Sequence, residues 1–455
     1  MARVRPLSGY PEWTPSQRVV ETQVLAAIAE VFEVHGFGEI QTRAVETLER
    51  LAGKSEASKE IYTLGRLNAD DDAEAKVGLH FDLTVPFARY VEEFQNDLQF
   101  PFRRYQIQKV WRGERPQEGR FREFYQADID VVARDVLAPH FEVEVAVVMA
   151  RALAALPVPG ARMHVNNRQL VEGFYRGVGI DDVADALRSV DKLDKIGPDG
   201  VRAELADKGV GESAADAILE LARISAADAS FAAAIEDLWA TTTTIAEVAD
   251  AEAQLKAGIA ALVELVEGVN AAVPGTAVAD LRIARGLDYY TGSVYETFLT
   301  GHEDLGSICS GGRYDSLVAG GGFPGVGMSI GVSRLVSRML SAGLASASRG
   351  VPSAVMVAVT DEDTRGESVR IADRLRARGV ACEVSPKAAK FGKQIQLADK
   401  RGIPFVWFPA SVSADAASPV EGDGEVKDIR SGEQVPADAD VWLPPAADAR
   451  PRIVS

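Results

Sequence analysis

Residues 102–132 read FRRYQIQKVWRGERPQEGRFREFYQADIDVV, and this stretch decides the fold. Two strand-like runs flank a charged loop whose turn residues are Pro116 and Gly119, a pattern that predicts a hairpin. Seven basic and two acidic residues lie between Arg103 and Arg122, a local net charge of +5. Guanidinium groups at the base and on the loop of a hairpin suit phosphate binding, because each presents a planar fork of donors. A solvated hairpin held by salt bridges is the alternative interpretation.

The composition of the whole chain narrows its class. Its 455 residues suggest about three domains at roughly 150 residues each. With 47% hydrophobic and 25% charged residues, a soluble globular protein is expected rather than a disordered or fibrous one. The formal net charge of −18 repels nucleic acid overall, so any nucleic-acid surface has to be a local basic patch.

The cysteines and the apolar runs indicate a compartment. Cys309 and Cys382 lie far apart and outside any CxxC pair, which argues against a disulfide scaffold or a Cys-based zinc site and favours a reducing cytosol. No apolar run approaches the roughly 20 residues of a membrane span, and the start MARVRPLSGY lacks the apolar stretch of a signal peptide. The five histidines fall in no repeated metal spacing, so no metal held by the protein alone is expected. We therefore expect a cytoplasmic protein without a membrane partner.

Four segments of different character follow one another along the chain. Residues 1–180 hold the hairpin and an LHFDLT stretch that enters a helix. Residues 181–275 are Ala-rich and helical in period, and 181–267 hold 19 acidic and 7 basic residues, a net charge of −12. Residues 276–345 return to Gly-rich, strand-like sequence and end in a helix. Residues 346–455 start with a small polar linker, and the order β-α-β-α-β that follows predicts a parallel sheet.

A second motif, GVGMSIGVSRL over residues 325–335, is a glycine-spaced strand that enters a helix with Arg334 in its first turn. The glycines would let a ligand approach the backbone, and Arg334 would meet its phosphates. A glycine series alone more often marks a packing strand. Its value here comes from its place in the chain after the charged hairpin.

These segments resemble those of the class II aminoacyl-tRNA synthetases. The hairpin is similar to motif 2, and residues 325–335 are similar to motif 3. The helix-plus-strand region 16–46 occupies the place of motif 1, which builds the dimer interface in that class. Within the class, residues 281–292 (LRIARGLDYYTG) and 310–315 (SGGRYD) resemble the two signatures of the histidyl-tRNA synthetase family.

The resemblance implies an α+β class II synthetase core, an antiparallel sheet flanked by helices, in residues 1–180 and 276–345. It also implies a helical insertion domain in 181–275 and a C-terminal α/β anticodon-binding domain with a tail in 346–455. The implied activity is that of a ligase: ATP-dependent activation of L-histidine to histidyl-adenylate with pyrophosphate release, then transfer to the 3′ end of tRNA(His). ATP as substrate, Mg²⁺ and a homodimer are implied with it.

Both reactants of the activation step are anions, so cationic groups have to cancel their repulsion and hold them in line. The resemblance assigns catalytic roles to Arg112 and Arg285 on opposite sides of the α-phosphate, with Arg285 in a role usually filled by a metal. The residues that it assigns to ATP are Arg112, Glu114, Arg120, Phe124 and Arg334. Those that it assigns to histidine are Asp82, Thr84, Gln126, Asp130, Tyr289 and Tyr290. Those that it assigns to the tRNA acceptor stem are Gln117, Arg120 and Arg122.

Residues 364–401 form a second basic patch, with ten basic and four acidic residues, a net charge of +6. Such a patch suits an anticodon-binding surface, and a solvated helix face is the alternative. One rival function is a non-catalytic regulatory subunit of ATP phosphoribosyltransferase, a synthetase-like protein that generally lacks the C-terminal domain and the signature Arg. Another is a class II synthetase for threonine or proline. Two positions depart from the family pattern: Arg43 stands where motif 1 usually has proline, and Ser333 where motif 3 usually has an acidic residue.

Overall fold

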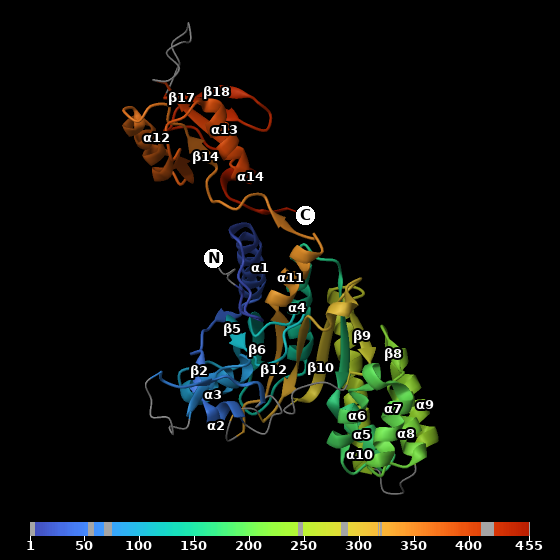
Figure 1. Cartoon of the computed structure of the whole chain (residues 1–455). Coiled ribbons are helices and arrows are strands. Elements are labelled where there is room, and N and C mark those ends of the chain that lie inside the picture. Colours follow the sequence, from blue (N-terminus) through green and yellow to red (C-terminus); the bar gives the residue numbers. More distant parts are fainter. Residues whose placement is uncertain are drawn as a thin grey trace. The chain divides into compact units, whose positions relative to one another are not determined.

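The computed structural model describes residues 5–52, 59–67, 75–243, 249–283, 290–316, 318, 321–410 and 423–454. The chain divides into two compact units (Figure 1). The larger unit comprises Met1–Pro11 and Val24–Arg338, and the smaller comprises Glu12–Gln23 and Met339–Ser455. Within the described ranges, no helix combines the length and the apolar character needed to cross a bilayer.

A nine-stranded sheet forms the centre of the larger unit, in the order β1-β5-β6-β12-β11-β10-β7-β9-β8. The predicted hairpin is confirmed: β5 (Phe102–Trp111) pairs antiparallel with β6 (Glu123–Val132) along their full length. The antiparallel run continues through β12 (Gly325–Gly331), β11 (Cys309–Tyr314), β10 (Tyr290–Leu299) and β7 (Ala161–Asn167).

The outer strands make this sheet mixed, where the sequence predicted an antiparallel one. At one edge β1 (Gly38–Glu39) runs parallel to β5, and near the other β9 (Ala277–Asp280) runs parallel to β7. The last strand, β8 (Ser225–Ala226), is antiparallel to β9. The central run that carries the predicted motifs is nonetheless antiparallel throughout.

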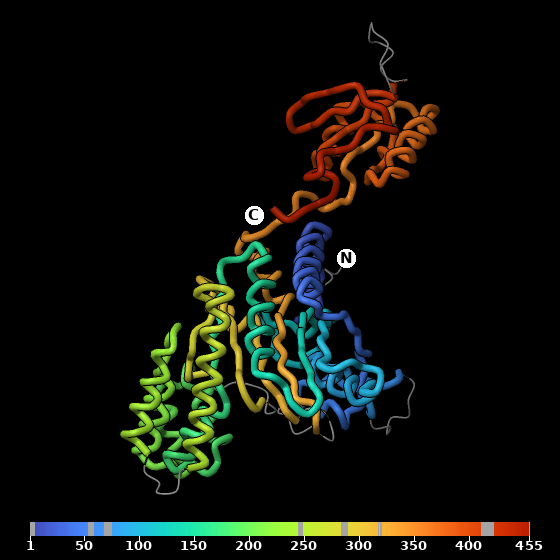
Figure 2. Tube along the Cα trace, turned by 180° about the vertical axis from the view of Figure 1, so that it is seen from behind, coloured from blue at the N-terminus to red at the C-terminus, as the bar shows by residue number. Residues whose placement is uncertain are grey.

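Two helices lie across one face of this sheet, α4 (His140–Ala154) and α10 (Ala249–Ala272), as Figure 2 shows. Helix α4 is buried on all sides over much of its length, because the consecutive residues Val145 to Ala150 are all buried, as are Ala152 and Leu153. The helix expected in the helix-plus-strand region 16–46 is α1 (Pro15–Val34), in which Val24, Ile28 and Phe32 recur every fourth residue and are fully buried.

The LHFDLT stretch leads into α3 (Thr84–Phe94), as predicted. Beside it lies a small sheet of β2 (Val45–Thr47), β4 (Val77–Leu79) and β3 (Thr63–Leu64), with the short helix α2 (Leu48–Ala52). Strand β4 thus brings Asp82 and Thr84 to the start of α3, because only four residues separate it from that helix.

The Ala-rich acidic segment is helical, as predicted. Its helices are α6 (Val183–Val190), α7 (Leu193–Asp207), α8 (Glu212–Leu221) and α9 (Ser230–Thr242), each packed on the next and gathered together in Figure 1. Helix α10 packs differently, along α5 (Arg168–Gly177) and α4. The α5–α10 contact is backbone to backbone, because a Cβ on Gly258 would lie 2.3 Å from the Leu170 nitrogen and one on Gly173 2.5 Å from the Leu255 nitrogen.

The smaller unit holds the predicted β-α-β-α-β order in β14 (Val355–Val357), α12 (Arg365–Ala377), β15 (Cys382–Val384), α13 (Phe391–Lys400) and β16 (Phe405–Pro409). Strands β15, β14 and β16 are parallel, as predicted. The sheet then adds an antiparallel hairpin that was not predicted, β17 (Gly424–Asp428) and β18 (Gln434–Ala437). Fully buried Trp407 lies in an apolar core of this unit together with Val355, Val357 and Leu375.

We expect Gly258→Ala to destabilise the larger unit by about 1–3 kcal/mol, because the added methyl group would force α5 and α10 apart. Chemical denaturation followed by circular dichroism measures this change. The control is Ala257→Ser on the exposed face of the same helix, which should change stability by no more than about 0.5 kcal/mol. Equal stability of the two variants would contradict the close packing of α5 and α10.

Candidate active site

A cavity of about 350 Å³ opens over strands β6, β11 and β12 and the loop that joins β5 to β6. Its walls include every residue that the family resemblance assigns to ATP, and also one assigned to histidine. These residues are Arg112, Glu114, Arg120, Phe124, Arg334 and Gln126. Segments that are about 200 residues apart in the sequence therefore meet at one hollow, because β12 pairs with β6 in the sheet.

Arg112 directly follows the last residue of β5, and hydrogen bonds hold both its backbone and its side chain. Its backbone N–H donates to the Arg122 carbonyl oxygen at 3.0 Å, and its Nε donates to the Phe81 carbonyl oxygen, also at 3.0 Å. The guanidinium carbon lies 5.2 Å from the centre of the Phe124 ring. These contacts fix the direction of the guanidinium group, so that its position does not depend on a bound anion.

Arg334 enters the cavity from the first turn of α11 (Val332–Ser341). Its Nε donates to the Gly119 carbonyl oxygen at 3.0 Å, and its Nη1 donates to the Ser307 carbonyl oxygen at 2.5 Å. Burial lowers the pKa of Arg334, and the positive charges of Arg120 and Arg112 lower it further. Three guanidinium groups that repel one another around one hollow make a site for a polyanion.

Ser333, which departs from the family pattern, has a contact that explains it. Its hydroxyl oxygen accepts a hydrogen bond of 2.9 Å from the Tyr125 backbone N–H, and the residue is buried. The hydroxyl thereby ties α11 to β6, so that Arg334 and Phe124 keep a fixed spacing. The other departure, Arg43, is an exposed residue that forms an ion pair of 3.1 Å with the buried carboxylate of Glu46.

The loop between β5 and β6 is folded back on itself. Gln117 and Arg120 exchange backbone hydrogen bonds, and Gly119 between them has a φ of +70°. Of the three residues assigned to the acceptor stem, Gln117 and Arg120 are exposed. Arg122 is half-buried, and its Nε donates to the Glu114 carbonyl oxygen at 3.2 Å, which holds the loop closed.

Behind the Gln126 wall of the cavity lies a cluster of buried charges. Asp130, assigned to histidine, is 2% exposed. Its Oδ1 accepts a hydrogen bond of 2.7 Å from the Tyr314 hydroxyl, and its Oδ2 lies 2.5 Å from Arg104 Nη2. Burial raises the pKa of Asp130 to about 7 despite the charge of Arg104. Each carboxylate oxygen keeps a second lone pair that could accept from a ligand.

Gly327 makes room for this carboxylate. A Cβ at position 327 would lie 2.0 Å from Asp130 Oδ1. The motif 3 glycines were expected to let a ligand approach the backbone, but at Gly327 a side chain of the neighbouring strand takes that space. The reason is the register, which places Gly327 directly opposite Asp130.

Asp82 and Tyr290 lie at other edges of the same region. Asp82 is buried at the start of α3, where its Oδ1 accepts a 3.2 Å hydrogen bond from the Val85 N–H. Burial raises the pKa of Asp82 to about 6. Tyr290 pairs with Tyr314 in the β10–β11 register and is half-buried, as is Thr84. Arg285 and Tyr289 lie outside the described residues.

Three residues of this cluster were not among the predicted site residues: Arg104, Asp128 and Tyr314. A signal for Asp128 was present, because Gln126, Asp128 and Asp130 alternate along β6 and therefore share one face. Arg104 lies directly opposite Asp130 in the hairpin, a pairing that follows from the turn position. Tyr314 reaches the cluster from a strand almost 200 residues later, and nothing local in the sequence indicates this.

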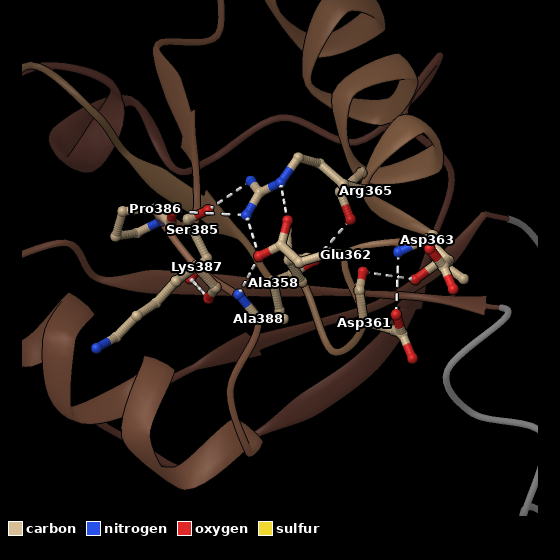
Figure 3. Close-up of polar contacts among 12 residues, drawn as sticks. Ala358, Asp361, Glu362, Asp363, Arg365, Ser385, Pro386, Lys387 and Ala388 are labelled. Carbon is tan, nitrogen blue, oxygen red and sulfur yellow. Dashed lines mark hydrogen bonds and ion pairs between the residues drawn. The ribbon is translucent and has the colours of Figure 1, made fainter.

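The smaller unit carries a second polar network at the carboxyl ends of its parallel strands (Figure 3). Arg365 pairs with Glu362 at 2.6 Å and donates to the Ser385 carbonyl oxygen at 2.9 Å. Glu362 in turn accepts from the Ala388 N–H at 2.8 Å. Figure 3 shows the Lys387 side chain pointing away from this network, and the residue is exposed.

Both units of the chain match models of known protein families. A family model described as histidyl-tRNA synthetase matches residues 9–335, and one described as anticodon binding domain matches residues 354–438. The chain is 54% identical to the histidine–tRNA ligase of Cutibacterium acnes and 53% identical to that of Micrococcus luteus, in each case over all of this chain and 99% of the relative.

Solved structures agree in fold. The crystal structure of histidyl-tRNA synthetase from Nostoc sp. PCC 7120 superposes with a TM-score of 0.82 at 35% identity, covering 97% of this chain and 98% of that one. A structure from Bacillus halodurans, described as an ATP phosphoribosyltransferase regulatory subunit/histidyl-tRNA synthetase, shares the fold with a TM-score of 0.69 at 19% identity, over 88% of this chain and 97% of that one. The chain therefore belongs to the histidyl-tRNA synthetase family, with a class II synthetase catalytic domain and a C-terminal anticodon-binding domain.

Proposed function

We propose that this chain is a histidine–tRNA ligase. It activates L-histidine with ATP to histidyl-adenylate, releases pyrophosphate, and transfers the histidyl group to the 3′ end of tRNA(His). The observation that carries this proposal is the convergence of Arg112, Arg120 and Arg334 on one cavity whose Gln126 wall adjoins a cluster of buried carboxylates. A polyanion site beside a cation site is what ATP and an amino acid with an α-ammonium group require.

The activation step joins two anions. The carboxylate of histidine attacks the α-phosphate of ATP, and pyrophosphate leaves from the opposite side. Arg112 binds the α-phosphate, Phe124 stacks on adenine, and Arg334 and Arg120 bind the outer phosphates. Arg285 meets the α-phosphate from the other side, and its assignment rests on the family signature. Cations held in place before the reaction lower the barrier, because they need no reorganisation as charge develops.

Histidine lies on the β6 side of the cavity. Asp82, Thr84 and Gln126 take the α-ammonium, Asp130 pairs with one imidazole nitrogen, and Tyr289 and Tyr290 close the pocket. The buried position of Asp82 and Asp130 supports this assignment. The pairing of Asp130 with Arg104 and Tyr314 fixes where an imidazole would find its acceptor.

Mg²⁺ fits as an ion carried with the nucleotide. Among the described residues, no group of three or more His, Cys, Asp or Glu side chains could hold a metal. Glu60, Glu114 and Glu296 line the cavity as separate carboxylates. One or two carboxylates together with substrate phosphates are the ligand set that Mg²⁺ usually takes. The bound ion supplies charge neutralisation of the leaving pyrophosphate.

The partners follow from the two units. The exposed loop residues Gln117 and Arg120 approach the acceptor stem, and Arg122 stiffens that loop. The smaller unit reads the anticodon at its basic patch. A homodimer forms through the motif 1 region, where β1 lies exposed at the sheet edge. The reaction takes place in the cytoplasm, where Cys309 and Cys382 stay as free thiols.

The regulatory-subunit alternative is not favoured. The relatives that are 53–54% identical over the full chain are named histidine–tRNA ligases. The chain also retains the signature Arg285 and residues matched by an anticodon-binding domain. A protein that only regulated another enzyme would need neither feature.

Histidine-dependent ATP–pyrophosphate exchange tests the proposed activity. We expect exchange with histidine and with none of the other nineteen amino acids. Arg112→Ala and Arg285→Ala should each lower the exchange rate by about 100-fold or more, because each removes a cation from the α-phosphate. Arg115→Ala, on the same loop and exposed, is the matched control and should retain the rate. No exchange in the wild-type protein would refute the function.

The Arg104–Asp130 pair gives a stability prediction. Arg104→Met should lower the free energy of unfolding by about 3–5 kcal/mol, because it leaves buried carboxylates without their cation. The double variant Arg104→Met/Asp130→Asn should recover much of that loss, since it also removes the charge. Urea denaturation of the two variants measures the difference, and equal losses would mean that the pair is not the cause.

The basic patch of the smaller unit predicts a tRNA-specific defect. Replacing the exposed residues Lys387, Lys390 and Lys393 together by Ala should lower kcat/KM for tRNA charging by about tenfold or more and flatten its dependence on salt. Pyrophosphate exchange should stay within about twofold, because it needs no tRNA. Lys256→Ala, an exposed lysine of α10, is the control. A loss in exchange as large as the loss in charging would contradict the assignment.

A further inference from the structure

Asp128 is a buried carboxylate to which the family resemblance gives no role. We propose that Asp128 binds the α-ammonium group of histidine together with Asp82 and Gln126. This inference rests on the proposed function and adds one residue to its amino-acid site.

Asp128 lies on β6 between Gln126 and Asp130, the two residues of this strand that are assigned to histidine. Strand β6 presents Gln126, Asp128 and Asp130 on one face, because side chains alternate along a strand. Gln126 lines the cavity, and Asp130 lies deeper with Arg104 and Tyr314. Asp128 is 3% exposed, so its carboxylate is shielded from bulk water.

A hydrogen-bonded chain links Asp128 to Gln126. Gln126 Nε2 donates to the Ser329 hydroxyl oxygen at 2.9 Å, and that hydroxyl bonds to Asp128, its partner across the β6–β12 register. A hydroxyl has a single proton, so it donates to the carboxylate while it accepts from the amide. The chain therefore orients the Gln126 side chain with its Oε1 left as an acceptor.

Three buried oxygen atoms in this region have no hydrogen-bond partner within the part of the chain that the structure describes. They are Asp82 Oδ2, Gln126 Oε1 and Asp128 Oδ1; Arg104 Nε and Nη2 are buried donors without a hydrogen-bond partner in the same cluster, and that guanidinium group is held by its ion pair with Asp130. All three oxygen atoms are acceptors, and a buried acceptor without a donor costs free energy. An ammonium group brings three N–H donors and no acceptor, so it matches the set in number and in kind.

The balance of charge also favours a cation. Three buried carboxylates, Asp82, Asp128 and Asp130, face two guanidinium groups, those of Arg104 and Arg112, and among the described residues only Asp130 forms a direct ion pair with one of them. Burial raises the pKa of each carboxyl to about 6, although the charges of Arg104 and Arg112 lower both pKa values; Asp128 also raises the pKa of Asp82. An ammonium group would supply the missing positive charge where water is excluded.

A pair of inhibitors isolates the contact with the ammonium group. Histamine carries imidazole and an ammonium group, and 4-ethylimidazole has the same carbon skeleton without the ammonium. Their inhibition constants against histidine are measured by pyrophosphate exchange with wild-type protein and Asp128→Asn. We expect Asp128→Asn to raise the inhibition constant of histamine by about tenfold or more, the size of a lost charged hydrogen bond. The inhibition constant of 4-ethylimidazole should change by less than threefold.

Further variants separate this contact from damage to the fold. Ser329→Ala keeps Asp128 but releases the Gln126 amide, and should weaken histamine less than Asp128→Asn does. Glu46→Gln removes another buried carboxylate, one paired with Arg89 outside the site, and should leave the ratio of the two inhibition constants unchanged. Melting curves of all variants show that each protein is folded.

The outcomes are distinct. Equal weakening of both inhibitors by Asp128→Asn would overturn the proposal, because the residue would then support the pocket or the imidazole rather than the ammonium. No change in either inhibitor would overturn it as well. Wild-type protein without histidine-dependent exchange would overturn the proposed function itself. If wild-type exchange is normal but Asp128→Asn leaves the ratio of the two inhibition constants unchanged, only the role of Asp128 is overturned.

Discussion

The buried ion pair between Arg104 and Asp130 is the interaction on which the catalytic unit depends. It crosses the β5–β6 hairpin at opposed positions, and both side chains are almost wholly removed from water. Such a pair is stable only where further hydrogen bonds satisfy it, and the Tyr314 hydroxyl from β11 provides one. Three strands are thus tied at one point, and the cavity walls of β6 and β12 are built around it.

Charge is segregated on the two sides of this point. Guanidinium groups of the loop and of α11 converge on the cavity, whereas carboxylates of β6 and α3 lie behind its Gln126 wall. Neither group of like charges would be stable without compensation from a ligand or from neighbouring dipoles. The arrangement therefore favours a substrate pair in which one partner is polyanionic and the other carries a cationic end. This is the same demand that the chemistry of amino-acid activation makes.

Much of this could be predicted from the sequence, because several signals are local. The hairpin is predicted by its turn residues, α1 by its apolar period, and the parallel strands β15, β14 and β16 by their alternation with helices. The residues that the family resemblance assigns to ATP line one cavity. Their roles as ligands of ATP and histidine stay predictions.

The rest depends on pairing between distant segments. The parallel strands at the sheet edges, the packing of α10 on α5 and the hairpin β17–β18 follow from tertiary contacts that no short window contains. The hydrogen bond from Arg122, which the resemblance assigns to the acceptor stem, to the Glu114 carbonyl oxygen is another contact that the sequence did not indicate. Arg104 and Asp128 lie in the hairpin that resembles motif 2. They were not predicted as site residues because the family resemblance gives them no role.

Gly327 has a consequence for how this sequence can change over evolutionary time. Because any Cβ there would overlap the Asp130 carboxylate, no other residue fits while that carboxylate keeps its place. A shorter side chain at position 130 would make room for a Cβ at position 327. It would also leave the buried side chains of Arg104 and Tyr314 without their partner. Each single replacement therefore passes through a poorly packed intermediate, so the two positions are expected to drift together or not at all.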